Sequence, residues 1–422
     1  MTLKINILRG QNQIGGSIIE IYTESTRIII DAGANLGEGL LHTYVPKVPG
    51  LFSGKPAYDA VFVSHYHSDH MGLLKYVVDG IPIYMGHATY DIALAMSEYK
   101  GRTLDFTPTF IDAGVPVTVG DIAVTPVLCD HSAFGTFMFL IKSSGKTVLY
   151  SADFRSTGRM DFSALLEELP EVDALIVEGT TLSRGLDFHE PSEQELEDFA
   201  VETMERHKGP TLVYLSAQNV DRIVTAYNAA CRTGRRFIMD ELTALVAETA
   251  GLKIDGSVLR ASHSLADLGE VVATSAGGIA SHGKSKGGLF GEHRRATVFP
   301  AVSERKAFAS PDFMLCITPQ SLINFRKVAH RSSFKDGVLF IARRETEILK
   351  PAASAFISFM KSIGAEVPVL HTSGHADSGT IDRLIRDVRP SVIIPVHTEK
   401  ADWFAQYEDE CLVVYDCRNY EL

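Results

Sequence analysis

The stretch HYHSDH, residues 65–70, decides the fold of this chain, and it directly follows the apolar run Tyr58–Ser64. That run is rich in β-branched and aromatic residues, which is typical of a buried strand. The six residues after it include four side chains that bind metals. On a helix these four would point in different directions, because adjacent positions do not share a helix face. On a tight loop at a strand end, they can converge on two adjacent ions.

Four further apolar runs end at, or just before, a histidine or a carboxylate. Imidazole and carboxylate together suit zinc or a similar borderline ion, and a shared carboxylate suits a site with two metals. The runs are Val124–Leu128 before Asp130 and His131, Thr147–Ala152 before Asp153, Ala174–Val177 before Glu178, and Val392–Val396 before His397.

The composition is that of an ordinary globular protein, with 45% hydrophobic residues among 422 and a net charge of −12. The five cysteines are odd in number and form no C-x-x-C pair, so neither a disulfide framework nor a cysteine zinc site is indicated. We expect reduced thiols and a cytoplasmic protein. No uncharged apolar stretch is long enough to span a bilayer, so we expect no membrane association.

One part of this acidic chain is basic. Residues 281–350 carry 13 Lys and Arg against 6 Asp and Glu, which suits either a solvated face or contact with nucleic-acid phosphates. Residues 278–285 also fit the P-loop pattern G-x-x-x-x-G-K-[ST]. A P-loop opens a helix, however, and the glycines at 287–288 would break one. We interpret this segment as a basic loop whose Lys284 and Lys286 could meet a phosphate backbone.

The chain changes its pattern near residue 208. Before it, strand-like runs dominate, beginning with the hairpin Ser17–Tyr22 and Arg27–Asp31. After it, the strand Thr211–Leu215, the amphipathic helix Asn219–Cys231 and the strand Arg236–Met239 form a βαβ unit. Such a unit implies a parallel sheet.

The candidate metal ligands lie on both sides of this βαβ region. We therefore predict an α/β protein in which one metal-binding domain is interrupted by an inserted Rossmann-like domain. Helical periodicity is also present at Gly72–Val78 and Ala88–Ser97. The predicted boundaries are 1–207 and 366–422 for the metal-binding domain and 208–365 for the insertion.

The spacing His-x-His-x-Asp-His, followed by His131, Asp153 and His397, resembles the metallo-β-lactamase superfamily. The resemblance implies an αββα sandwich, a site on loops at one sheet edge, and two zinc ions. Asp31 matches an acid behind the ligands in that family, and a turn-forming Asp before Ala-Gly is an equal alternative. By position, His65, His67 and His131 would hold one ion, Asp69, His70 and His397 the other, and Asp153 would bridge them.

Three further features narrow the resemblance. Glu178 at its strand end, His375 in the string HTSGHA and His397 in the string PVHTE are similar to the extra motifs of the β-CASP nucleases. The ribonuclease J and polyadenylation-factor endonuclease branches match best, and a histidine at the third motif is similar to the RNA-processing members. Family members commonly have Glu-Ser-Thr where this chain has a glycine, Gly179, after Glu178.

The resemblance implies a phosphodiesterase mechanism. Two cations can share a hydroxide and place it in line with a scissile phosphate, and Asp69 would lie beside this nucleophile. His375, oriented by Glu178, would give a proton to the leaving oxygen. The alternatives are a His375 bonded to backbone and a Glu178 that caps a turn. Ser373 and His371 are candidate phosphate contacts.

We therefore expect a zinc-dependent phosphodiesterase that hydrolyses RNA with a two-metal-activated hydroxide, in RNA processing or decay. DNA as the substrate and a non-nucleolytic hydrolase of the metallo-β-lactamase type are the alternatives. An RNA-binding subunit without catalysis is disfavoured, because none of the ligands is missing. The oligomeric state and the choice between endonuclease and 5′-exonuclease action are left open. Acyl or thioester hydrolysis would not explain the insertion, Glu178 or His375.

Overall fold

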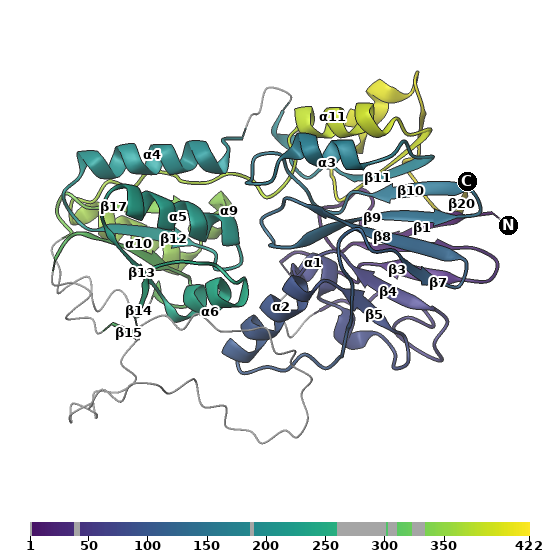
Figure 1. Cartoon of the computed structure of the whole chain (residues 1–422), viewed down its shortest axis with the longest axis horizontal. Coiled ribbons are helices and arrows are strands. Elements are labelled where there is room, and N and C mark those ends of the chain that lie inside the picture. Colours follow the sequence, from purple (N-terminus) through teal and green to yellow (C-terminus); the bar gives the residue numbers. More distant parts are fainter. Residues whose placement is uncertain (1, 38–42, 186–189, 260–300, 303–309, 323–333) are drawn as a thin grey trace. The chain divides into compact units, whose positions relative to one another are not determined.

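The computed structural model describes residues 2–37, 43–185, 190–259, 301–302, 310–322 and 334–422 (Figure 1). The chain forms two compact units. Unit 1 comprises Met1–Leu196, Gln218–Asp221 and His371–Leu422, and unit 2 comprises Glu197–Ala217 and Arg222–Leu370. Among the described residues, every helix is too short or too polar to cross a membrane.

The first sheet of unit 1 has the strand order β20-β1-β2-β3-β4-β5-β6. The predicted hairpin is confirmed, since β2 and β3 pair antiparallel with Ile19 opposite Ile30. Strands β3 to β6 are parallel, so their carboxyl ends share one edge of the sheet. The strands are β1 (Lys4–Arg9), β2 (Ile18–Tyr22), β3 (Arg27–Ile30), β4 (Ala60–Val63), β5 (Ile83–Met85), β6 (Thr109–Phe110) and β20 (Tyr420–Glu421).

The second sheet of unit 1 has the order β19-β18-β11-β10-β9-β8-β7. Strands β10, β11, β18 and β19 are parallel, and β7 to β10 pair antiparallel. The strands are β7 (Val117–Val119), β8 (Ile122–Cys129), β9 (Thr136–Ser143), β10 (Lys146–Tyr150), β11 (Ala174–Glu178), β18 (Val392–Val396) and β19 (Leu412–Val413).

The two sheets of unit 1 pack face to face. Their shared core includes Ile19 and Phe62 from the first sheet and Phe139 and Ile176 from the second, all fully buried. Helices α3 (Phe162–Glu168) and α11 (Ser378–Val388) lie side by side on the outer face of the second sheet (Figure 1). After the first sheet's strands come the short α1 (Ser68–Met71) and the longer α2 (His87–Tyr99). The predicted αββα sandwich is confirmed.

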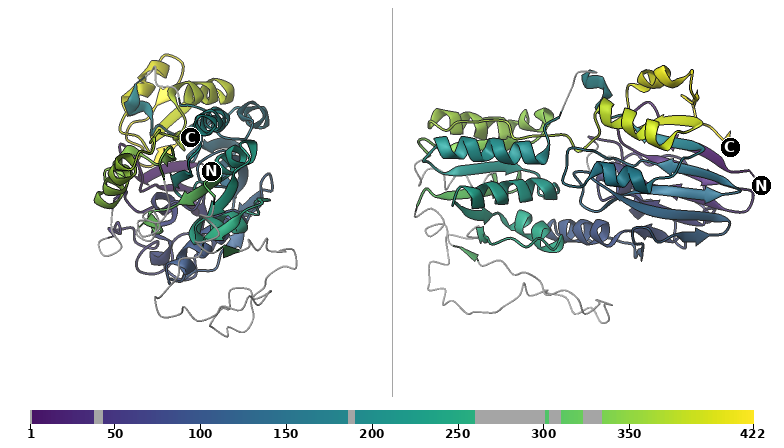
Figure 2. Two further views of the ribbon diagram at one scale, coloured as in Figure 1. Left: turned by 90° about the vertical axis from the view of Figure 1, so that its left-hand side faces the viewer. Right: turned by 45° about the horizontal axis from the view of Figure 1, so that its top comes forward.

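In its described residues, unit 2 contains a six-stranded sheet with the order β15-β14-β13-β16-β12-β17, and all five neighbouring pairs are parallel. The predicted βαβ unit is confirmed. Figure 2, left, shows helices α5 and α10 on opposite sides of this sheet. The elements are α4 (Glu193–Arg206), β12 (Thr211–Leu215), α5 (Val220–Arg232), β13 (Arg236–Met239), α6 (Glu241–Thr249), β14 (Ser257–Leu259), β15 (Ala301–Val302), β16 (Phe313–Ile317), β17 (Val338–Ala342), α9 (Glu345–Ile348) and α10 (Pro351–Ser362).

Candidate metal centre

The candidate ligands lie at the carboxyl ends of strands from both sheets of unit 1. Residues 65–70 follow β4 of the first sheet, while Asp153 and Glu178 come from the parallel neighbours β10 and β11 of the second. His397 follows β18, the next parallel strand. Strand β8 runs in the direction of β10, because both are antiparallel to β9, and this brings His131 to the same edge.

The seven predicted ligands form two groups, and within each group the donor atoms lie within 4.8 Å of one another. Asp153 belongs to the first group and also reaches the second. Its Oδ2 is 3.2 Å from Nε2 of His70, and its Oδ1 is 3.9 Å from Nδ1 of His397. The first group is His65, His67, His131 and Asp153, and the second is Asp69, His70 and His397.

Among the described residues, three buried polar atoms of this cluster have no hydrogen-bond partner. They are Nε2 of His65, Nε2 of His70 and Oδ1 of Asp153. Leaving such an atom unpaired costs about 1–3 kcal/mol, and native proteins contain few of them. Here the three belong to side chains that face one another, with Nε2 of His65 3.8 Å from Oδ2 of Asp153. Imidazole and carboxylate donors in this arrangement fit a zinc-like ion.

Asp31 fixes the orientation of His70 from behind. Its Oδ2 accepts from Nδ1 of His70 at 2.8 Å and from the hydroxyl of Tyr150 at 2.8 Å. The backbone N–H and the hydroxyl of Ser64 also donate to this carboxylate, at 2.8 and 2.9 Å. The Ser64 hydroxyl in turn lies 3.0 Å from Nδ1 of His65. One buried acid thus fixes the tautomer of one histidine and, through a serine, the position of a second.

Two other histidines are held in the same way. Nδ1 of His397 pairs with the hydroxyl of Thr180 at 2.8 Å, and Nδ1 of His131 donates to the carbonyl of Gly374. In His67 it is Nδ1, and not Nε2, that faces the other donors, because it lies 3.1 Å from Nε2 of His131. In four of the five histidines, therefore, a protein group occupies Nδ1 and leaves Nε2 for a ligand.

The electrostatics of the cluster suit a bound cation. Burial and the adjacent His70 hold the pKa of His65 well below its ordinary value, so this ring is a neutral donor. Burial would also lower the pKa of His70 and His397, but the nearby carboxylates, Asp153 foremost, raise it. Burial would raise the pKa of Asp153, but His397 and His70 hold it well below its usual range. The same buried carboxylates that raise the pKa of these two histidines would attract a bound cation.

The predicted catalytic pair lies beside the ligands. Nδ1 of His375 is 3.0 Å from Oε2 of Glu178 and 3.7 Å from Oδ2 of Asp153, and all three side chains are buried. Glu178 also accepts the backbone N–H groups of Phe154 at 3.1 Å and Thr180 at 3.2 Å. It therefore makes both of the contacts considered for it, to backbone and to His375, and the backbone contacts fix the carboxylate that orients the ring.

Two family models match the chain: the beta-lactamase superfamily domain over residues 26–213, and the Zn-dependent metallo-hydrolase RNA specificity domain over residues 362–410. The chain is 20% identical over 421 residues to ribonuclease J of Helicobacter pylori strain B128, an alignment that covers 94% of this chain and 56% of that protein. It is 28% identical over 235 residues to the transcription termination factor FttA of Methanocaldococcus jannaschii, which covers 48% of this chain and 36% of that protein. The chain thus spans about half the length, or less, of these relatives.

A crystal structure of a protein of unknown function from Enterococcus faecalis V583 has the same fold, with a TM-score of 0.77 and 19% identity over 100% of both chains. The chain belongs to the β-CASP branch of the metallo-β-lactamase superfamily. Since the donor cluster fits a metal and one matching family is described as zinc-dependent, the centre of this β-CASP protein is a metal site.

A buried arginine that the sequence did not single out holds the turn of His375. Arg155 is 1% exposed, and its Nη1 donates to the carbonyl of Ser373 at 3.1 Å. Its Nε donates to Asp130 at 2.7 Å, directly before His131. One guanidinium thus fixes the backbone beside a metal ligand and beside the predicted proton donor. Its other carboxylate partners are Glu193 and Asp221.

Of the four candidate phosphate contacts, two lie in the described residues and two do not. The hydroxyl oxygen of Ser373 accepts the backbone N–H of His375 at 3.1 Å, and its own proton stays available to a phosphate. His371 lies half-buried at the start of the same turn. Lys284 and Lys286, and the P-loop-like pattern at 278–285, lie outside the described residues.

Proposed function

We propose that this protein is a zinc-dependent phosphodiesterase that hydrolyses RNA. The observation that carries the proposal is the contact of His375 with Glu178 beside the metal centre. An oriented histidine of this kind suits a leaving group that needs a proton, as the ribose 3′-oxygen does. The relatives are named as a ribonuclease and a transcription termination factor, and the model matching residues 362–410 is described by RNA specificity, which supports RNA as the substrate.

We assign two zinc ions to the centre, because the donors divide into two groups with Asp153 in reach of both. Bound there, the two cations would neutralise charge on the phosphate and lower the pKa of a water molecule toward neutrality. The residues holding the first would be His65, His67 and His131, those holding the second Asp69, His70 and His397, with Asp153 shared between them.

The side chains of this protein supply the remaining chemistry. His375 gives a proton to the leaving oxygen from Nε2, because its Nδ1 is held by Glu178. The Glu178 carboxylate stabilises the protonated ring before the transfer. Asp69, whose Oδ2 is 3.3 Å from Nε2 of His397, faces the same space and orients the attacking water. Ser373 donates its hydroxyl proton to a phosphate oxygen.

Several wider assignments belong to the same proposal. His371 is assigned to the phosphate as well, and Lys284 and Lys286 to the RNA backbone further from the metals. Residues 208–365 are assigned to the β-CASP domain, and residues 1–207 and 366–422 to the metallo-β-lactamase domain. The five cysteines are all free, which supports a reducing compartment such as the cytoplasm.

The test compares end-labelled RNA, single-stranded DNA and duplex DNA as substrates. We expect cleavage of RNA in preference to both DNAs, and two equivalents of zinc per chain by elemental analysis. Asp69→Ala should lose most of the turnover while its circular dichroism stays that of the folded protein. Preferred cleavage of DNA would replace RNA as the substrate. Hydrolysis of a thioester without any cleavage of nucleic acid would contradict the phosphodiesterase assignment.

A further inference from the structure

A stacked pair of exposed rings lies on unit 1 outside the metal centre. The rings of His87, at the start of α2, and Phe110, at the end of β6, stack with centroids 3.8 Å apart and an angle of 17°. Tyr90 packs edge-on against Phe110 at 5.7 Å. His87 is exposed, and Phe110 keeps 40% of its surface in solvent. An aromatic pair ordered on one side and open on the other is a preformed stacking surface.

Sheet register places this pair beside the metal centre. In the parallel strands β4 and β5, Val63 pairs with Met85, so His65 and His87 both come two residues after the paired positions. Met85 in turn pairs with Phe110 of β6. Because neighbouring strands lie about 4.8 Å apart, His87 is about one strand spacing from the line of β4 and Phe110 about two. The stacked pair and the ligand loop, residues 65–70, share the carboxyl edge of the first sheet.

The loop that carries His131 packs against the start of α2. A Cβ added at Gly86 would come within 2.7 Å of the Phe137 ring, and one added at Gly135 within 2.7 Å of Ala88. Phe137 is also tied to the ligand loop, since its N–H donates to the carbonyl of Ser64 at 3.1 Å. Close packing of this kind leaves the stacked pair little freedom to move relative to the metal ligands.

A third exposed ring lies close to the ligands. Phe134 follows His131 by three residues, is 40% exposed, and its N–H donates to the hydroxyl of Tyr66 at 2.8 Å. Tyr66 itself lies between the ligands His65 and His67. Exposed aromatic rings thus follow strands of both sheets, near residues 65–70 and near His131.

We propose that the stacked pair His87–Phe110, extended by Phe134, binds the bases of single-stranded RNA next to the phosphate that reacts. This inference rests on the proposed function. Bases stack on aromatic rings regardless of their identity, whereas bases in a duplex are already stacked on one another and cannot use such a surface. The surface lies beside the metal centre, where the nucleotides flanking a cleaved phosphate must run, and this favours RNA over a protein as its occupant. These three rings, called the platform below, would therefore select single strands without selecting a sequence.

The experiment uses the zinc-loaded protein and a single-stranded RNA with hydrolysis-resistant phosphorothioate linkages and one 2-aminopurine. Stacking quenches 2-aminopurine fluorescence, so we expect quenching with the wild type and its loss in the double variant His87→Ala, Phe110→Ala. Binding should weaken about 5- to 150-fold for the loss of one stacked base. The loss of cleavage on RNA should exceed any loss on bis-p-nitrophenyl phosphate, which has no bases, by about fivefold or more.

Two further variants make the test specific. Phe110→Leu keeps an apolar side chain against Tyr90 but removes the ring face, so it should weaken RNA binding almost as much as alanine does. Tyr99→Ala removes another exposed aromatic at the far end of α2 and should leave binding and quenching unchanged. Should the double variant fail to fold, Phe110→Leu and single His87→Ala carry the same measurement.

The outcomes separate this inference from the proposed function. A wild type that cleaves RNA, with Phe110→Leu and His87→Ala binding as tightly as it does, would overturn the platform and leave the nuclease intact. A leucine variant that binds normally beside an alanine variant that does not would mean an apolar contact, such as a protein partner, and would also overturn it. A wild type that neither binds nor cleaves RNA would overturn both.

Discussion

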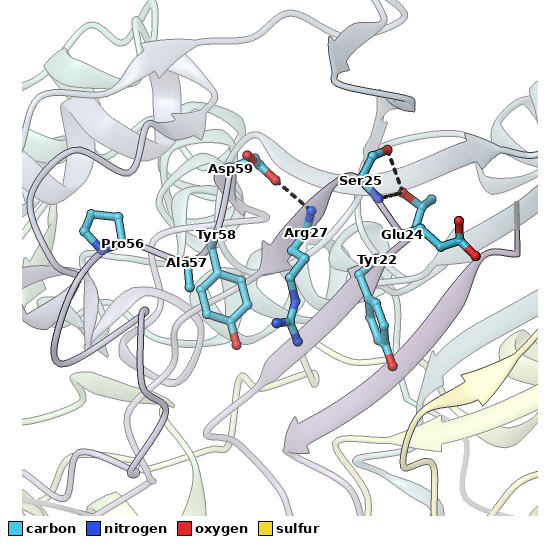
Figure 3. A pocket seen from close by; sticks show the side chains of 9 residues that line it. Tyr22, Glu24, Ser25, Arg27, Pro56, Ala57, Tyr58 and Asp59 are labelled. Carbon is cyan, nitrogen blue, oxygen red and sulfur yellow. Dashed lines mark hydrogen bonds between the residues drawn. The ribbon is translucent and has the colours of Figure 1, made fainter.

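The parallel strands β3 and β4 have charged and aromatic side chains at both ends. One end forms the metal centre, and the other end forms a cavity. At their carboxyl ends stand Asp31 and residues 65–70 of the metal centre. At their amino ends, Arg27 and the pair Tyr58 and Asp59 line an open cavity of about 510 Å³ (Figure 3). The two ends thus bring charged and aromatic groups together at opposite edges of the same sheet.

Arg27 and Asp59 at the amino end find their partners within the protein. The guanidinium of Arg27 points between the rings of Tyr22 and Tyr58, 5.2 and 5.4 Å from their centroids, as Figure 3 shows. It pairs with the buried Glu20 at 2.6 Å, and the Arg27 N–H donates to Asp59 at 2.8 Å. Burial and Glu20 together raise the pKa of Tyr58 to about 12, so this phenol stays neutral.

The difference teaches that a cavity and a reactive site are separate things. The amino end is hollow, but Arg27 and Asp59 there are paired within the protein. The carboxyl end has three buried atoms, on His65, His70 and Asp153, that find no hydrogen-bond partner in the part of the chain that the structure describes. A buried polar atom without a partner costs free energy, and a bound ligand would offset that cost. We expect substitutions at the carboxyl end to act on metal and catalysis, and those at the amino end on stability alone.

The largest effect is expected for Asp153→Asn. The amide has nearly the size of the carboxylate but lacks the charge that both donor groups share, so zinc content should fall below two equivalents per chain. Turnover of RNA should fall by more than the about 10²–10⁴-fold typical of losing one proton-transfer group. Elemental analysis and single-turnover cleavage measure the two effects. A variant with two zinc ions and normal turnover would show that Asp153 is not needed for metal binding or catalysis.

The next effect is selective for the substrate. His375→Ala should slow RNA cleavage by about 10²–10⁴-fold, because the 3′-oxygen must be protonated as it leaves. Bis-p-nitrophenyl phosphate has a leaving group that needs little protonation, so its hydrolysis should fall far less.

Zinc content is the control for this variant, because donor atoms of His375, Glu178, Asp153 and His397 also lie within 4.8 Å of one another. Unchanged zinc supports the role of proton donor, whereas a loss of zinc would make His375 a ligand. Equal slowing on both substrates would instead assign it to phosphate positioning.

A smaller effect is expected at Asp31, which contacts the ligand His70. Asp31→Asn keeps the shape of the side chain but weakens its hold on Nδ1 of His70, and such changes typically lower metal affinity by about 10–100-fold. Competition with a chromophoric chelator measures the affinity. Asp59→Asn is the matched control at the other end of the same strands and should bind zinc as the wild type does. Equal affinities in the two variants would remove the distinction between the ends.

The sequence predicted those parts of this centre that depend on a regular pattern of apolar residues in strands and helices. The ligand loop at 65–70 follows its strand as expected, and the helix predicted at Ala88–Ser97 is present as α2. The helix predicted at Gly72–Val78 is wrong. Only the 3₁₀ turn Leu74–Tyr76 forms there, because Val77 already has extended backbone angles of −63° and 130°.

The supporting residues were beyond prediction for a different reason. Ser64, Thr180 and Arg155 are single polar residues, and nothing in their spacing distinguishes them from surface residues. Their roles arise from contacts between segments distant in the chain, such as Thr180 with His397 or Arg155 with Ser373. Sequence patterns report which face of an element is buried, whereas a hydrogen bond between loops depends on the completed tertiary structure.

The smallest effect is expected at the amino end, from Arg27→Met. Methionine keeps apolar contact with the two tyrosine rings but leaves the buried Glu20 with fewer donors, so the free energy of unfolding should fall by about 1–3 kcal/mol. Asn6 still donates to Glu20 at 2.8 Å, and the Arg27 side chain is half exposed, both of which favour the lower part of that range. Denaturant titration measures the loss, and Arg27→Lys, which keeps the charge, should lose less. Zinc content and RNA turnover should match the wild type in both variants. A fall in either without unfolding would mean that the two ends of these strands are coupled, and that pairing within the protein does not isolate the cavity from the metal centre.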